Sequence, residues 1–126
     1  MMHASGVGKA LLAAMGAEEA ERVAAMHGLP AETGKTIGSI EGLRAELEQV
    51  RRRGYAVDDE ENAVGLRCVA AAIYDEHAQP VAALSLSGPT ARIDDKLLAP
   101  LGAAVREAAD EITGSLGGRN GLKGRY

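Results

Sequence analysis

Two strand-like runs, residues 66–74 and 80–88, constrain the fold of this chain more than any other feature. They are rich in Ala, Val and Leu, and only the polar segment 75–79 separates them. Two apolar runs with a linker of this length predict an antiparallel hairpin. Pro80 fits only the start or edge of a strand, because proline cannot donate a ladder hydrogen bond. Residues 55–58 read as a third, shorter strand.

Helical patterns flank these strands. Ser5 and Asp94 are candidate N-caps, and Gly54 is a candidate C-cap. In the last helix Pro100 would clash with the preceding turn, so we expect either a kink or a helix that starts at Pro100. Four helices with three strands indicate an α+β fold. The predicted helices cover residues 4–15, 17–27, 40–53 and 94–116.

The composition excludes several classes of protein. A chain of 126 residues fits one domain, and without Phe or Trp its core must be built from aliphatic side chains. A net charge of −4 argues against direct binding of nucleic acid, which needs a basic surface. No apolar run approaches the roughly 20 residues of a membrane span, and no secretion signal is evident. Cys68 is the only cysteine, which suits a reducing cytoplasm.

Small polar residues share one face of the predicted hairpin. Side chains alternate faces along a strand, so Ser85 and Ser87 lie opposite Leu84 and Leu86, whose face we expect to be core. Cys68 joins the serine face only if the hairpin register allows it. Each of these has a purely structural alternative, since strand serines are usually solvated and a buried cysteine usually acts as a small hydrophobe.

The segment Gly6-Val7-Gly8-Lys9 begins the first predicted helix. It lacks the GxxxxGK[ST] spacing of a phosphate-binding loop. Free N–H groups at a helix start nevertheless favour an anion, and glycines let a ligand approach the backbone. Close packing of helix on sheet explains the two glycines equally well. The acidic run 58–61 could contribute Asp58, although a solvated loop is its ordinary interpretation.

No catalytic centre is evident in the sequence. Cys68 has no histidine partner, because His3, His27 and His77 are scattered over a terminus, a helix end and a polar loop. Their spacing matches no metal site. We therefore expect no catalytic residue, no metal site and no cofactor, and a small pocket that holds a small anion.

Five short blocks then follow in order along residues 3–118: His3 to Ala13, Arg52-Arg53-Gly54-Tyr55, Asp58-Asp59-Glu60-Glu61, Gly65-Leu66-Arg67-Cys68-Val69-Ala70 and Ser85-Leu86-Ser87-Gly88-Pro89. In sequence and spacing they resemble the effector-binding domain of the isocitrate lyase regulator (IclR) family. The resemblance is nearest to the branch of the family that represses the glyoxylate bypass.

This resemblance implies a GAF-like (profilin-like) domain, an antiparallel sheet flanked by helices, over residues 1–118. The glycine-rich segment 119–126 falls outside the resemblance, and its composition predicts a flexible tail. Family members are non-enzymatic bacterial transcriptional regulators that act as homodimers or homotetramers and bind DNA through a winged helix-turn-helix. In the nearest branch the effectors are glyoxylate and pyruvate. Mapped onto this sequence, the ligand contacts would be Gly6, Val7, Asp58, Cys68, Ser85 and Ser87.

The chain also departs from the family pattern. Its 126 residues contain no winged helix-turn-helix, so we do not expect them to bind an operator unaided. The first strands of the family's domain, and an apolar lining contact from the same region, are not among these residues. Val7 stands where the nearest branch usually has alanine, so its extra methyl groups would narrow the pocket. An oligomerisation module that senses no ligand, and a Cys68-based enzyme, are the alternative interpretations.

Overall fold

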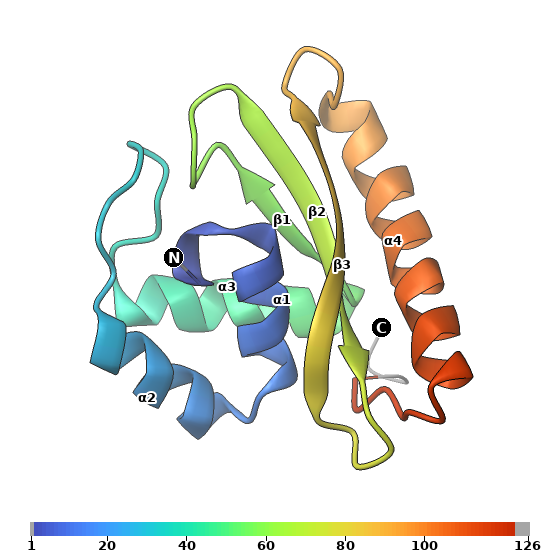
Figure 1. Cartoon of the computed structure of the whole chain (residues 1–126). Helices are drawn as coiled ribbons and strands as arrows, with labels where there is room; N and C mark the ends of the chain where they lie inside the picture. The colour runs from blue at the N-terminus through green and yellow to red at the C-terminus, as the bar shows by residue number, and fades with distance from the viewer. Residues whose placement is uncertain (1, 123–126) are drawn as a thin grey trace.

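The computed structural model describes residues 2–122 and has three layers (Figure 1). One side of the sheet carries α1 (Gly6–Ala14), α2 (Ala17–His27) and α3 (Ile40–Arg53), preceded by a short 3-10 helix over Met2–Ala4, and the other side carries α4 (Asp95–Ser115). The sheet itself contains β1 (Ala56–Asp59), β2 (Leu66–Tyr74) and β3 (Pro80–Pro89). Helices on both faces of an antiparallel sheet confirm the predicted α+β fold.

Helix ends follow the predicted capping residues. The side chain of Ser5 accepts a hydrogen bond from Gly8 N, and Asp94 accepts from Lys96 N and Leu97 N. Gly54 ends α3 in the left-handed conformation, with φ of 82°. The last helix begins at Asp95 and continues through Pro100, so the alternative of a helix that starts at Pro100 is wrong. Capping by Asp94 secures the turn that precedes the proline.

Two apolar clusters hold the layers together. On the α1–α3 side the buried side chains include Leu12, Leu43 and Leu47, packed against Ala56 and Ala70 of the sheet. On the α4 side they are Val69, Ala71, Ile73, Val105 and Ala109. Alternate residues of β2 therefore feed different clusters, which explains why this central strand is apolar on both faces.

The hairpin turn and the segment after α4 contact each other. Arg119 N donates to Asp75 O at 2.9 Å, and a side chain on Gly118 would collide with Tyr74 O. Asn120 Nδ2 donates to Asp110 Oδ1 at 2.6 Å. These contacts involve the first residues of the predicted flexible tail, whereas residues 123–126 lie outside the described residues.

Candidate functional site

Asp58, Cys68 and Ser87 form one row across the sheet. Asp58 of β1 is paired with Cys68 of β2, and Cys68 is paired with Ser87 of β3. The register thus meets the condition under which Cys68 joins the serine face. Ser85 is paired with Ala70, one step further along the same face. Directly paired residues have Cβ atoms roughly 5 Å apart, so the row extends roughly 10 Å from Asp58 to Ser87.

The start of α1 lies against this row. A Cβ built on Gly6 would come within 2.9 Å of Cys68 Sγ, so the helix can approach β2 this closely only with glycine here. A Cβ on Gly8 would instead collide with the backbone of Met2. Close packing of the helix on the sheet therefore explains the glycine at position 6. It does not explain Gly8, which packs on the 3-10 helix instead.

The N–H groups at this helix start are only partly used. Gly8 N donates to Ser5 Oγ at 2.9 Å, and Lys9 N donates to Ser5 O at 2.9 Å. The N–H groups of Gly6 and Val7 precede these and have no acceptor within the helix. Free N–H groups and the helix dipole favour negative charge at a helix start of this kind. The Val7 side chain packs against the core cluster of α1–α3.

The serine side of the row is open rather than enclosed. Ser85 and Ser87 are exposed, and β3 is an edge strand among the described residues. The row therefore runs from a buried end, at Asp58 and Cys68, to an exposed end at the two serines. The expectation of a core face on β3 holds for Leu84, which packs against the α4 cluster, but Leu86 is 44% exposed. It lies on the edge strand, where no further strand of the described chain covers it.

Asp58 is buried, and its carboxylate closes the acidic turn. Oδ1 accepts hydrogen bonds from Glu61 N at 2.9 Å and from Asn62 N at 3.3 Å. Burial raises the pKa of Asp58 above its usual value of 3.8, against the opposing effect of these two amides and of the Lys9 charge. A carboxyl group with a raised pKa can accept from a ligand hydroxyl when ionised, or donate when protonated.

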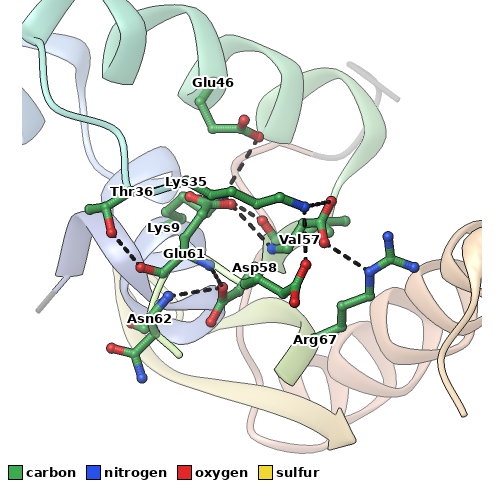
Figure 2. Close-up of polar contacts among 12 residues, drawn as sticks. Lys9, Lys35, Thr36, Glu46, Val57, Asp58, Glu61, Asn62 and Arg67 are labelled. Carbon is green, nitrogen blue, oxygen red and sulfur yellow. Dashed lines mark hydrogen bonds and ion pairs between the residues drawn. The ribbon is translucent and has the colours of Figure 1, made fainter. Parts of the chain in front are cut away.

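Lys9 and Glu61, which the sequence analysis did not assign to the site, form a buried ion pair beneath it (Figure 2). Lys9 is 0% exposed and Glu61 only 7% exposed. The interpretation of residues 58–61 as a solvated loop is therefore wrong for Asp58 and Glu61. The sequence offered one signal for this pair, a lysine at a glycine-rich helix start and an acidic run some fifty residues later. Nothing in the spacing of the residues predicts that these two segments meet.

Two further cations contact the same acidic turn, the exposed Lys35 and the mostly buried Arg67. Lys35 Nζ lies 3.1 Å from Glu60 Oε2, and Arg67 Nε donates to Asp59 Oδ1 at 2.8 Å (Figure 2). Arg67 also reaches Asp95 at the start of α4, at 2.8 Å. Hydrogen bonding to Arg67 lowers the pKa of Asp59, in contrast to its neighbour Asp58.

Other candidate chemistry lies away from the row. His3 is buried, and its Nε2 donates to Pro30 O at 2.9 Å, while His77 is exposed in the hairpin turn. A hollow of about 240 Å³ lies between the 3-10 helix, α1 and α2, lined by residues that include Leu12, Val23 and Leu29. Within residues 2–122 no cluster of His, Cys, Asp and Glu could hold a metal ion. None of the helices in that range has the length and apolar character to cross a bilayer.

The groups along the row are of the kinds that hydrogen-bond a small acid. Helix N–H groups and two hydroxyls can donate to a carboxylate, and Asp58 can accept from a hydroxyl. Cys68 Sγ donates to Val69 O, in its own strand, at 3.7 Å. The row therefore combines donors, one acceptor and small spacers.

Comparison with known proteins agrees with this geometry. Residues 1–114 match the family described as "Bacterial transcriptional regulator IclR C-terminal". The acetate operon repressor of Salmonella typhimurium is 51% identical over 117 residues, which cover 93% of this chain and 43% of that protein. The chain thus spans less than half the length of this relative.

Solved structures share the fold. The Thermotoga maritima IclR structure superposes with a TM-score of 0.87 at 34% identity. The match covers 92% of this chain and 47% of the Thermotoga chain. The inducer-binding domain of the PobR transcription factor from Acinetobacter, solved as a double mutant with 3-hydroxybenzoic acid, gives a TM-score of 0.80 at 26% identity, covering 89% of this chain and 65% of that one. This chain belongs to the IclR family of bacterial transcriptional regulators, in which it corresponds to the C-terminal, effector-binding domain.

Proposed function

We propose that this chain is the sensing part of a transcriptional regulator and that it binds a two- or three-carbon 2-oxo acid, such as glyoxylate or pyruvate. The row of Asp58, Cys68 and Ser87 beneath the start of α1 is the observation that carries this proposal. The ligand carboxylate sits where the N–H groups of Gly6 and Val7 meet the hydroxyls of Ser85 and Ser87.

Asp58 contacts the end of the ligand opposite its carboxylate. A buried carboxylate beside a second carboxylate is unfavourable, so Asp58 faces the carbonyl end of the acid instead. There it accepts from a hydroxyl of the hydrated aldehyde, or donates its own proton to the carbonyl oxygen. Its raised pKa makes the protonated form more accessible than in a free side chain.

In the full-length regulator, this binding alters the oligomer state and, through it, the affinity of a winged helix-turn-helix for DNA. A ligand does this only if it binds one arrangement of a dimer or tetramer more tightly than the other. The activity is regulatory rather than enzymatic, and its place is the cytoplasm. That the Salmonella relative is a repressor of the acetate operon supports two-carbon metabolism as the source of the ligand.

Calorimetry with glyoxylate and with pyruvate tests the ligand class. The wild-type chain is expected to bind at least one of the two acids, and Ser85→Ala/Ser87→Ala to lose that binding while it keeps its melting temperature. Both serines are exposed, so their removal leaves no buried polar group unpaired. Ser115→Ala, which removes an exposed hydroxyl at the end of α4, is the matched control. A folded wild-type chain that gives no heat with either acid rejects this ligand class.

A second candidate function is a ligand-independent oligomerisation module. The open edge of β3 and the exposed Leu86 favour it, because an unpaired edge with apolar side chains is a surface on which chains associate. Sedimentation with and without each acid separates the two candidates. A sensor changes its association constant when the acid is added, whereas a passive module assembles identically in both conditions.

A further inference from the structure

Lys9 connects the first helix of the chain to both ends of the segment that carries Asp58. Its Nζ donates to Val57 O, immediately before Asp58, and to Glu61 Oε1 and Oε2 at 3.0 and 2.9 Å, three residues after it (Figure 2). The carboxylate of Glu46 on α3 lies 3.9 Å away on the other side. One ammonium group thus contacts three separate parts of the chain.

Glu61 links Lys9 to the Asp58 carboxyl, because it contacts both groups. Its backbone N–H donates to Asp58 Oδ1, and the next amide, that of Asn62, donates to the same oxygen. Its Oε2 also accepts from Asp59 N at 3.3 Å. The position of the Asp58 oxygen therefore depends on where the backbone of residues 61 and 62 lies, and Lys9 holds that backbone through the Glu61 side chain.

We infer that Lys9 is a positioning residue of the ligand site, and that its ion pair with Glu61 fixes the Asp58 carboxyl relative to the start of α1. The inference rests on the proposed function, in which Asp58 and the N–H groups of Gly6 and Val7 hold opposite ends of one ligand. Lys9 follows Val7 by two residues on α1, so the helix that supplies the amides also holds the acceptor.

A purely stabilising role is the alternative, and the physics of buried ion pairs separates the two. Removal of one partner leaves an uncompensated buried charge, which destabilises any such fold. Replacement of both partners by apolar side chains of similar volume is often neutral or stabilising. The double substitution Lys9→Met/Glu61→Leu therefore restores stability but does not restore the side-chain contacts that hold residues 57–62.

The experiment compares this double variant of the full chain with the wild type and with Lys35→Met. Lys35 pairs with Glu60 and Asp59 on the same segment, but from the solvent side, which makes it the matched control. Two quantities are measured: amide hydrogen exchange at Glu61 and Asn62, and the dissociation constants for glyoxylate and pyruvate by calorimetry.

The double variant is expected to melt within about 5 °C of the wild type, a shift worth roughly 1 kcal/mol in a chain of this size. Its backbone amides at positions 61 and 62, each compared with the intrinsic rate for its own sequence, should exchange at least about tenfold faster while those of β2 keep their rates. The acid should bind at least about tenfold more weakly. Lys35→Met should leave the exchange rates and the dissociation constants unchanged.

Wild-type exchange at both amides in a folded double variant overturns the inference, whatever the ligand does. Fast exchange with an unchanged dissociation constant also overturns it, because ligand binding would then not depend on how Lys9 holds the Asp58 carboxyl. If the wild type binds neither acid, the proposed function fails, yet the exchange rates still decide whether Lys9 holds the Asp58 segment. If the double variant does not fold, Glu61→Gln, which keeps the volume and one acceptor oxygen, is held to the same two outcomes.

Discussion

Gly6 and Cys68 touch in a way that leaves no room for a methyl group between them. A Cβ on Gly6 would lie 2.9 Å from Cys68 Sγ, whereas the next nearest atoms, including Ala70 Cβ, would be at an ordinary 3.5 Å. The thiol is buried, so it cannot turn out into solvent to make room. A side chain at Gly6 would therefore disturb the close approach of α1 to β2, on which the proposed site depends.

Gly6→Ala should destabilise the chain by roughly 1 kcal/mol, because the added methyl group over-packs a filled contact. In Gly6→Ala/Cys68→Ala the sulfur is gone, and the two substitutions should be less destabilising together than the sum of their separate effects. Urea unfolding of the wild type, the two single variants and the double variant gives the coupling energy between the two positions. A coupling of zero would mean that the helix start yields without touching Cys68.

Gly102 of α4 provides a second contact of this kind, against an aromatic ring. A Cβ there would come within 2.3–2.5 Å of the Tyr55 ring atoms. Gly102→Ala should cost about 1–3 kcal/mol, since either the ring or the helix must move. Gly114→Ala, on the same helix but with nothing within 4 Å, should instead stabilise by about 0.5–1 kcal/mol, because alanine favours the helix. Thermal unfolding of the two variants should therefore shift in opposite directions.

Arg51 joins α3 to the end of α1. Its Nε donates to Ala13 O at 2.9 Å, and it is the buried member of the three arginines that end α3. Arg51→Met should destabilise by about 1–3 kcal/mol, since the buried carbonyl loses its donor. Arg52→Met, one residue later and mostly exposed, should stay within about 0.5 kcal/mol of the wild type. Equal effects in urea unfolding would contradict a structural role for Arg51.

Local signals were sufficient for most of the fold. Capping residues and apolar periodicity placed the helix boundaries within a few residues, because Ser5, Gly54 and Asp94 act on the adjoining backbone alone. The alternation of β3 likewise put Ser85 and Ser87 on one face. Pro100 misled one of the two expectations: α4 begins after the Asp94 cap and continues through the proline, so the local proline penalty did not decide where the helix begins.

Long-range relationships could not be predicted in the same way. Whether Cys68 faces the serines depends on the register, which a slip of one residue would reverse. The burial of Lys9 and Glu61 depends on a contact between residues 52 positions apart. A buried ion pair and a solvated one look identical in sequence, because composition and spacing carry no information about which charges the fold encloses.

The two neighbouring carboxyls of β1 should respond to pH with opposite signs. Burial raises the pKa of Asp58 above 3.8, so in the window above 3.8 the folded state keeps a proton that the unfolded state has released. The free energy of unfolding therefore falls as pH rises through that window, by at most about 1.4 kcal/mol per pH unit. Asp58→Asn lacks this effect but keeps an acceptor oxygen for Glu61 N, so the wild type should lose stability relative to Asp58→Asn as pH rises from 3.8.

Asp59 is the internal control, because its hydrogen bond to Arg67 lowers its pKa below 3.8. Here the unfolded state holds the extra proton, so the wild type should gain stability relative to Asp59→Asn as pH rises toward 3.8, and level off above it. Urea unfolding of the three chains between pH 3 and 7 measures both differences against the same background of other titrating groups. If the stability differences from Asp58→Asn and from Asp59→Asn change with pH in the same direction, Asp58 is solvated. The proposed site would then lack its buried carboxyl.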